Sequence, residues 1–344
     1  MNNKKILLIG PYPPPYGGVS MHVKRLKALL SDWFDIDVVD ESREKKKSIF
    51  NLRSLNIFKY LYKVLKTDIV HIHSGKFFFR LLHFSAASLF FKKKIMTIHG
   101  YEPGRGANIR SMDRTILNNC NKVIFVSKEL AEAFKVKQYV IKEAFLPPDV
   151  NNEAEIPAEL AGWIEQKRSQ GYKISVANAW RLDRHENEDL YGLDLCIMAS
   201  KKNKVNGIKS ASIFVVSDGS GVIKTDKYKK MIKDFGLEDC FLIWEAPLSF
   251  INLIIKTDIV LRPTNTDGDA LTVREGLFLG KPVIASDIVI RPVGTKLFKT
   301  RDAGSLAQAI ADVIRAGQNN PELTADTETS LKSYVEYYKN NVYN

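Results

Sequence analysis

Two acidic residues, Asp267 and Glu275, stand eight positions apart in the segment DGDALTVREGLFLGKPVIASD. Small, loop-compatible residues follow Asp267, and the next stretch has the pattern of a short helix that stops at a glycine. Backbone amides of residues 268–271 at the start of that helix can hold an anion, while both carboxylates can accept hydrogen bonds from sugar hydroxyls. The alternative is that Asp267 caps the loop and Glu275 forms a surface ion pair with Lys281 or Arg274.

Two other segments offer groups that could bind phosphate. Arg181 comes directly after the apolar run KISVANAW, where its guanidinium could clamp a diphosphate through paired hydrogen bonds. Arg184, inside the charged stretch DRHENED, is expected on the surface. Near the start of the chain, Gly17 and Gly18 open into a helix, so backbone amides there can approach an anion. Their spacing is not G-x-G-x-x-G, and a plain turn explains the two glycines equally well.

Three histidines follow apolar runs of strand length. A histidine in such a place can donate a hydrogen bond to a sugar hydroxyl or a phosphate, and it can change charge near neutral pH. His71 and His73 are expected to be structural residues. His99 is the better binding candidate, because Gly100 and a loop with Gly104 and Gly106 follow it. No third ligand stands at a suggestive spacing, so no metal site is expected.

The elements that would position these residues form two series of apolar strands separated by helices. Nearly continuous apolar strands alternating with helices predict a parallel sheet covered on both faces. The first series ends near Pro148 and the second begins with KISVANAW, so the chain is expected to hold two doubly wound domains facing each other across a cleft. In such sheets ligands bind outside the carboxyl ends of the strands, where all the candidate residues fall. The expected parts are an N-terminal domain 1–150, a connector 151–172, a C-terminal domain 173–325 and a C-terminal helix 326–344 that docks back on the N-terminal domain.

Composition narrows the class of protein. The chain has 344 residues, ordinary apolar content and a net charge of +12 spread over several lysine clusters, which indicates attraction to anions. The basic residues form no nucleic-acid recognition motif, so nucleic-acid binding is the weakest interpretation. Three scattered cysteines suit buried thiols in a reducing compartment, with the cytoplasm as the default. The first apolar run is too short for a signal peptide, and we expect no membrane-spanning segment.

With these residues in view, the chain resembles the bacterial retaining glycosyltransferases of the GT-B architecture, of the glycosyltransferase family 4 type. The resemblance extends over nearly the whole length. The most specific part is DGDALTVREGLFLGKPVIASD, which looks like the family's pair of acids with seven residues between them, followed by its Gly-Lys-Pro-Val strand. The other matching segments are GPYPPPYGGVSMHV, DIVHIHSG, TIHG, VIFVSKEL, FLPPDV and VVSDGS.

The resemblance implies a nucleotide-diphosphate-sugar donor held mainly by the C-terminal domain and a saccharide acceptor held mainly by the N-terminal domain. Glu275 matches the acid that bonds the ribose hydroxyls, and Asp267 matches the acid that contacts the transferred sugar. His99 matches a histidine near that sugar. The leaving phosphate is described as assisting the incoming hydroxyl, so neither a protein nucleophile nor a metal cofactor is implied. The matches to donor-binding residues are Gly17, Gly18, Arg181 and the amides of Gly268, Asp269, Ala270 and Leu271.

Two positions depart from the family pattern. The first acid is Asp267, one methylene shorter than the usual Glu. The family's phosphate-binding lysine, which precedes a glycine shortly after the arginine, is replaced by Tyr191 before Gly192, after an apparent insertion. Arg184 or Arg262 could supply the missing charge.

The segment KFFFRLLHFSAASLFFKKK, residues 76–94, is expected to be a helix that covers the sheet, and its lysines and extra phenylalanines also suit an anionic membrane surface. The function expected from the resemblance is transfer of a sugar to a lipid-linked saccharide in bacterial surface polysaccharide synthesis. The alternatives are a GT-B nucleotide-sugar epimerase and a non-catalytic partner protein.

Overall fold

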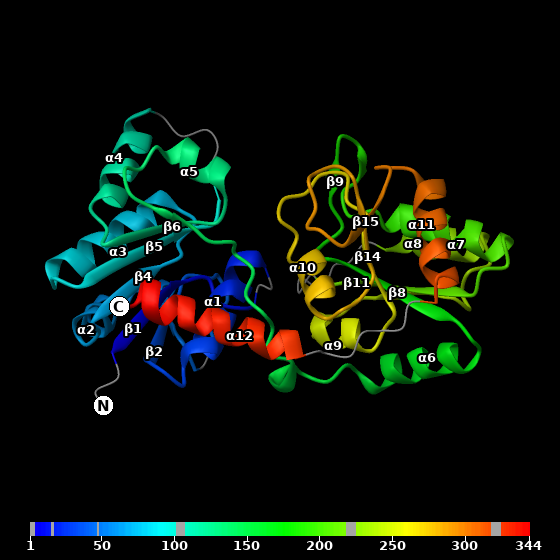
Figure 1. Ribbon diagram of the computed structural model, residues 1–344, viewed down its shortest axis with the longest axis horizontal. Helices are drawn as coiled ribbons and strands as arrows, with labels where there is room; N and C mark the ends of the chain where they lie inside the picture. The colour runs from blue at the N-terminus through cyan, green and yellow to red at the C-terminus, as the bar shows by residue number, and fades with distance from the viewer. Residues whose placement is uncertain (1–3, 15–16, 47, 101–106, 218–224, 318–324) are drawn as a thin grey trace. The chain divides into compact units, whose positions relative to one another are not determined.

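The computed structural model describes residues 4–14, 17–46, 48–100, 107–217, 225–317 and 325–344. The chain divides into two compact units (Figure 1). The N-terminal domain comprises Met1–Pro147 and Glu328–Asn344, and the C-terminal domain comprises Pro148–Thr327. The segment expected to be a connector therefore lies inside the C-terminal domain, where it forms the helix α6 (Ala158–Ser169).

The sheet of the N-terminal domain has seven parallel strands in the order β3-β2-β1-β4-β5-β6-β7. Successive residues of a strand point to opposite faces, so a strand buried on both faces is apolar throughout. In β1, Leu7 and Ile9 belong to one core, while Ile6 and Leu8 belong to the other. The strands are β1 (Lys5–Gly10), β2 (Asp35–Asp40), β3 (Phe50–Asn51), β4 (Ile69–Ile72), β5 (Lys93–Ile98), β6 (Lys122–Phe125) and β7 (Val140–Ile141).

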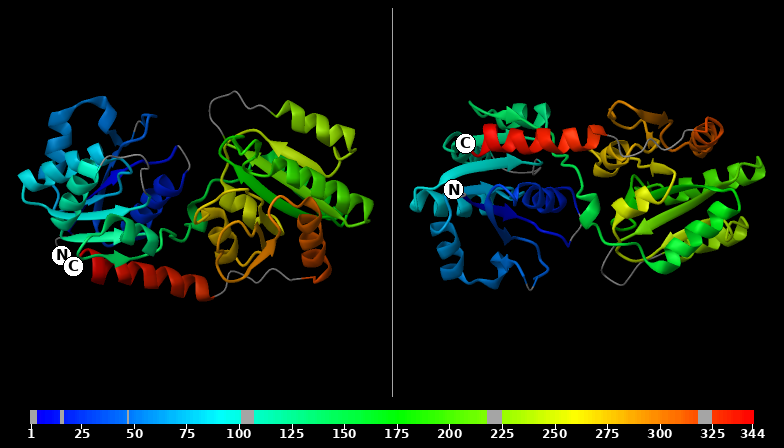
Figure 2. Two further views of the ribbon diagram at one scale, coloured as in Figure 1. Left: turned by 90° about the horizontal axis from the view of Figure 1, so that it is seen from above. Right: turned by 60° about the horizontal axis from the view of Figure 1, so that its bottom comes forward.

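Helices cover both faces of this sheet (Figure 1). Buried residues of α2, α3, α4 and α5 pack on the face of Leu7, and those of α1 and the C-terminal segment pack on the face of Ile6. The C-terminal segment contributes Tyr338 and Tyr343, and the ammonium of Lys4 donates to the carbonyl of Tyr343, so the C-terminal segment lies beside the start of β1 (Figure 2). The helices are α1 (Gly18–Leu30), α2 (Ile57–Leu65), α3 (Phe77–Leu89), α4 (Ala107–Asn118), α5 (Lys128–Phe134) and α12 (Ala325–Tyr337), which a π-helical turn, Tyr338–Val342, extends.

The C-terminal domain repeats the plan with six parallel strands in the order β12-β11-β8-β13-β14-β15. In both sheets the first strand of the domain lies between the second and the fourth, so the strand order reverses beside it. The strands are β8 (Lys173–Ala179), β11 (Ser210–Val216), β12 (Phe241–Trp244), β13 (Ile259–Arg262), β14 (Val283–Ser286) and β15 (Thr295–Phe298), and the helices besides α6 are α7 (Leu193–Val205), α8 (Asp226–Asp234), α9 (Phe250–Ile255), α10 (Leu271–Phe278) and α11 (Ala303–Arg315).

Candidate active site

The candidate donor-binding residues of the C-terminal domain gather where its strand order reverses. From the neighbouring strands β8 and β13 the chain continues to strands on opposite sides of this pair, β11 and β14. Open parallel sheets bind ligands outside the carboxyl ends of the strands at such a point. Arg181 follows β8, Arg262 ends β13, and the loop with Asp267 leads from β13 into α10.

Asp267 is the centre of an ion-pair cluster. Arg262 binds its carboxylate in bidentate fashion, with Nε and one terminal nitrogen each 2.9 Å from an oxygen. Arg291 donates to the same carboxylate at 2.8 Å, and the hydroxyl of Thr264 and the amide of Gly268 donate at 3.1 Å. Both carboxylate oxygens therefore accept bonds from protein donors. The predicted contact of Asp267 with a sugar stays a prediction, and it would have to compete with these five bonds.

The cluster sets the charge at this edge of the sheet. Burial alone would raise the pKa of Asp267, but hydrogen bonds and charge from Arg262 and Arg291 outweigh it and lower the pKa below its usual value. One carboxylate and two guanidiniums leave a net charge of about +1. The side chain of Arg291 is 2% exposed and that of Arg262 15%, so Arg262 is the one that a ligand can reach.

Tyr191, which occupies the position where the resemblance leads one to expect a phosphate-binding lysine, contacts Arg262. The guanidinium carbon of Arg262 lies 5.5 Å from the centre of the Tyr191 ring. The next residue, Gly192, adopts φ +70° and begins α7, and a β-carbon there would lie 2.1 Å from the carbonyl oxygen of Pro263. Tyr191 and Gly192 thus pack against the end of β13. The ring of Tyr191 contacts Arg262, the arginine that could supply the positive charge of the absent lysine.

The insertion before Tyr191 folds into a small antiparallel ribbon of β9 (Arg184–His185) and β10 (Glu188–Asp189). Glu186 and Asn187 both have positive φ, as a two-residue type I′ hairpin turn requires. Arg301 holds the ribbon through Glu188 and also binds Asp194. The insertion therefore has its own anchor outside the cluster around Asp267.

Helix α10 begins at the end of the loop that follows β13, so its amino terminus lies at the same edge of the sheet. Its N-cap residue, Ala270, makes no side-chain capping hydrogen bond, and its first turn holds no acidic residue. The backbone amides of the first turn and the positive end of the helix dipole therefore favour an anion there. Glu275 is buried in the second turn of this helix. Gly276 allows close packing, since a β-carbon there would lie 2.7 Å from Val283. At the other end, Lys281 donates to the carbonyls of Ile255 and Thr257. A surface pair of Glu275 with Lys281 is thus wrong.

Arg181 and Arg184, the two arginines after β8, are more exposed than the arginines of the cluster around Asp267. Arg181 is exposed, and its Nε donates to Asp183 at 2.8 Å. Its role as a phosphate clamp stays a prediction. Arg184 is also exposed and donates to the carbonyl of Asn187 within the ribbon, which confirms the expected surface position.

In the N-terminal domain, Gly17 is the N-cap of α1 and Gly18 its first residue. The hydroxyl of Ser20 accepts from the amide of Gly17. A β-carbon on Gly18 would meet nothing within 4 Å, and one on Gly17 would meet only Ser20 at 4.0 Å. Neither glycine is required by packing in the described part of the chain, which is consistent with close approach of a ligand to the backbone.

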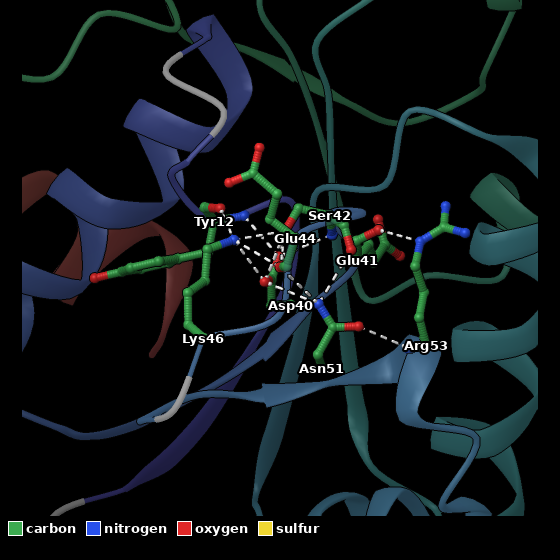
Figure 3. Close-up of polar contacts among 8 residues, drawn as sticks. All are labelled: Tyr12, Asp40, Glu41, Ser42, Glu44, Lys46, Asn51 and Arg53. Carbon is green, nitrogen blue, oxygen red and sulfur yellow. Dashed lines mark hydrogen bonds and ion pairs between the residues drawn. The ribbon is translucent and has the colours of Figure 1, made fainter. Parts of the chain in front are cut away.

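A buried polar network holds the loop before these glycines (Figure 3). The carboxylate of Asp40, at the end of β2, accepts from the amide of Tyr12, from Lys46 and from Asn51. Lys46 also donates to the carbonyl of Tyr12, which ties the proline-rich loop to the end of β2. The network fixes the entry of the chain toward α1, and the sequence motifs did not single out any of its members.

Four histidines stack at the carboxyl ends of β4 and β5. His71 is satisfied on both sides, by Tyr343 at 2.7 Å and Thr97 at 2.8 Å, which confirms a structural role. His73 and His99 are joined by a 3.1 Å contact between Nδ1 and Nε2. His22, one turn into α1, completes the group and was not expected there, since its position depends on how α1 packs against the strand ends.

Burial sets the charge of these rings. It lowers the pKa of His22 to about 4, with the charge of Arg25 adding to the shift. It also lowers the pKa of His71 to about 3 and the pKa values of His73 and His99 well below the usual range, with neighbouring histidines adding to these shifts. All four imidazoles are therefore neutral at pH 7. The glycines of the loop after His99, and the segment DGS after β11, lie outside the described residues.

Comparison with solved structures identifies the architecture. A glycosyltransferase from Rickettsia africae matches with a TM-score of 0.70 at 18% identity, over 98% of each chain. The chain has the GT-B fold. Anabaena HepE in complex with UDP matches this GT-B chain with a TM-score of 0.66 at 15% identity, over 96% of this chain and 94% of that one. The lipopolysaccharide outer core galactosyltransferase WaaB matches with a TM-score of 0.56 at 14% identity, over 98% and 96%.

Comparisons by sequence identify no relative. No protein-family model matches the chain, and no curated protein matches it. A structure of HepE in complex with UDP-glucose also matches, at 16% identity to this chain. At such identities the likeness shows the fold alone.

Proposed function

We propose that this protein is a retaining glycosyltransferase. It moves a sugar from a nucleotide-diphosphate sugar to a lipid-linked saccharide on the cytoplasmic face of the cell membrane, in bacterial surface polysaccharide synthesis. The observation that carries the proposal is the site at the strand ends of the C-terminal domain. There the uncapped start of α10 and the positive cluster around Asp267 follow the carboxyl end of β13, the edge at which open parallel sheets bind ligands.

The site divides into groups for the parts of a donor. The amides of residues 268–271 and the guanidinium of Arg262 bind the diphosphate, and Arg181 adds a second guanidinium. Glu275 accepts hydrogen bonds from the ribose, as the resemblance implies. Asp267 orients Arg262 and Arg291, and its carboxylate contacts the transferred sugar, as the resemblance implies. Retention follows from attack on the same face that the diphosphate leaves, with His99 beside the sugar and no protein nucleophile.

A panel of nucleotide sugars, titrated into the purified protein by calorimetry, tests donor binding. We expect one sugar nucleotide to bind one equivalent per chain, in the micromolar range typical of enzyme substrates. Incubation of the protein with the bound donor and no acceptor, followed by analysis of the donor, distinguishes the epimerase from the non-catalytic partner protein. A nucleotide-sugar epimerase would convert the donor to its isomer, and a non-catalytic partner would leave every donor unchanged.

Replacing Arg262 by methionine is expected to weaken donor binding about tenfold, because it removes a charged hydrogen-bond donor from the diphosphate. The measurement is the dissociation constant of the donor found in the panel. Arg184→Met is the matched control, since that exposed arginine bonds within the ribbon, and it should leave the constant unchanged. Unchanged binding in Arg262→Met, with weaker binding in Arg184→Met, would give the role to Arg184.

The lipid-linked acceptor is supported by the surface of α2 and α3. The buried residues of α3, among them Phe77 and Ala87, pack on the sheet, which confirms the core interpretation of that face. Apolar side chains of the two neighbouring helices and of residues next to them in the chain are nevertheless exposed: Phe58 in α2 is 84% exposed, and Phe91, two residues after α3, is 95% exposed. Lys59 and Lys63 belong to α2 and Lys92 follows Phe91, so this part of the chain combines apolar and positive groups as binding to an anionic lipid surface requires. The exposed set is Leu55, Ile57, Phe58, Tyr62, Leu65, Phe78, Leu82, Leu89 and Phe91.

No helix in the described part of the chain is long and apolar enough to cross a bilayer. Association would therefore be peripheral. We expect the protein to sediment with anionic vesicles at low salt and to dissociate as salt rises. The double variant Phe58→Ser, Phe91→Ser should lower vesicle affinity at least tenfold, since each ring contributes apolar area to the interface. Val205→Ser, an exposed apolar residue of the C-terminal domain, is the control. Equal vesicle binding by the original protein and both variants would show that Phe58 and Phe91 do not contact the membrane.

A further inference from the structure

The cluster of His22, His73 and His99 has the composition of a metal site. One ring nitrogen from each histidine lies within 4.8 Å of the other two. The three side chains come from α1 and from the ends of β4 and β5, so elements distant in sequence bring them together. Imidazole is a good ligand for zinc and its neighbours in the first transition row, and it ligates in the neutral form.

The hydrogen bond of His22 fixes its tautomer. Its Nδ1 lies 2.7 Å from the carbonyl oxygen of Ala144. A carbonyl can only accept, so Nδ1 carries the proton and Nε2 of the neutral ring carries a lone pair. This Nε2 is buried and has no hydrogen-bond partner among the described residues. A histidine whose second ring nitrogen donates to a backbone carbonyl is the usual outer-shell arrangement of a metal ligand.

The contact between His73 and His99 has the spacing of two ligands on one ion. Their facing nitrogens are 3.1 Å apart. Nitrogens bound to zinc at 2.0–2.1 Å in a tetrahedron are separated by about 3.3 Å. A metal ion bound by both rings would take the place of the hydrogen bond between these nitrogens, with the rings turned toward the ion. His71 is excluded as a ligand, since hydrogen bonds engage both of its ring nitrogens.

We propose that His22, His73 and His99 bind one divalent transition-metal ion, with zinc as the preferred ion. Three histidines leave a fourth tetrahedral position for an oxygen ligand such as water or a hydroxyl group. The proposal does not depend on glycosyl transfer, because binding by the N-terminal domain is measured directly. It replaces the expectation from sequence that no metal site exists, which rested on the missing third ligand that His22 now supplies.

The test uses the tag-free full-length protein stripped with a chelator. Titration with zinc, followed by calorimetry, and with cobalt, followed by visible absorption, should show one tight equivalent and the intense bands of a tetrahedral ion. His22→Gln and His99→Gln should each weaken zinc binding at least tenfold. His185→Gln, at an exposed histidine of the C-terminal domain, is the matched control and should bind as the original protein does.

X-ray absorption of the zinc-loaded original protein identifies the ligands of the ion directly, so the test does not depend on whether a variant folds. The proposal requires a first shell at about 2.0 Å with the scattering pattern of about three imidazoles. It is overturned by the absence of saturable binding, by a shell dominated by sulfur or carboxylate oxygen, or by affinity that falls in His185→Gln and not in His22→Gln.

Discussion

Replacing Asp267 by asparagine is expected to destabilise the C-terminal domain by about 3 kcal/mol, because removal of one partner from a buried ion pair leaves uncompensated charge. Arg291, whose side chain is 2% exposed, would lose the carboxylate of its ion pair, and Arg262 would lose a bidentate partner. Urea unfolding followed by tryptophan fluorescence measures the change, since three of the four tryptophans, at 163, 180 and 244, belong to this domain.

Two variants show whether the loss comes from the buried cluster. Asp269→Asn, two residues along the same loop, breaks the more exposed pair with Arg274 and should cost at most about 1 kcal/mol. The double variant Asp267→Asn, Arg291→Met should recover part of the lost stability, because it removes the unpaired guanidinium. If Asp267→Asn and Asp269→Asn unfold at the same urea concentration, Asp267 does not organise the cluster.

The same cluster predicts an acid limit to stability. The pKa of Asp267 is lower in the folded protein than its ordinary value of 3.8, so this carboxylate stabilises the fold above pH 4. That contribution falls as the pH drops below 4 and the folded-state pKa is passed. In Asp267→Asn the acid dependence should be correspondingly weaker.

Replacing Glu275 by glutamine is expected to abolish most donor binding, with at least a hundredfold loss of affinity. A carboxylate that accepts two ribose hydroxyls contributes two charged hydrogen bonds, each of about 1.5–3 kcal/mol. The amide is nearly the same size, so the close packing of α10 through Gly276 should survive. Calorimetry with the donor from the panel measures the loss, and unfolding of the variant shows that the fold is intact.

Glu238→Gln is the control for this substitution, because it removes one negative charge from an exposed position of the same domain. It should bind the donor as the original protein does. A folded Glu275→Gln protein with unchanged donor affinity would contradict the assignment of Glu275 to the ribose, and it would favour a purely structural role for that buried carboxylate.

Much of the fold was predictable because most strands are apolar on both faces. The runs around β1, β4, β8 and β13 are buried along nearly their whole length, and they were all predicted as strands. The edge strand β15 was missed, since only one of its four residues is buried. The run from Gln138 to Pro147 has the apolar pattern of a longer strand, but β7 pairs over only two residues.

The site was less predictable, since its decisive contacts join residues far apart in the chain. The motifs singled out Asp267 and Glu275 correctly as residues of one strand-end loop and its helix. They could not show that Arg291, which follows a different strand, binds Asp267. Nor could they show that His22 meets His73 and His99, because that contact depends on how α1 packs against two strand ends.

The most direct measurement of the central claim is the anomeric configuration of the sugar released from the donor. The protein is incubated with the nucleotide sugar that binds, first without acceptor and then with lipid-linked saccharides, and the products are followed by proton NMR. A retaining glycosyltransferase should release or transfer the sugar with the anomeric configuration of the donor, and Glu275→Gln should do so at least a hundredfold more slowly. An inverted product, an epimerised donor, or failure of every nucleotide sugar to bind would contradict the account.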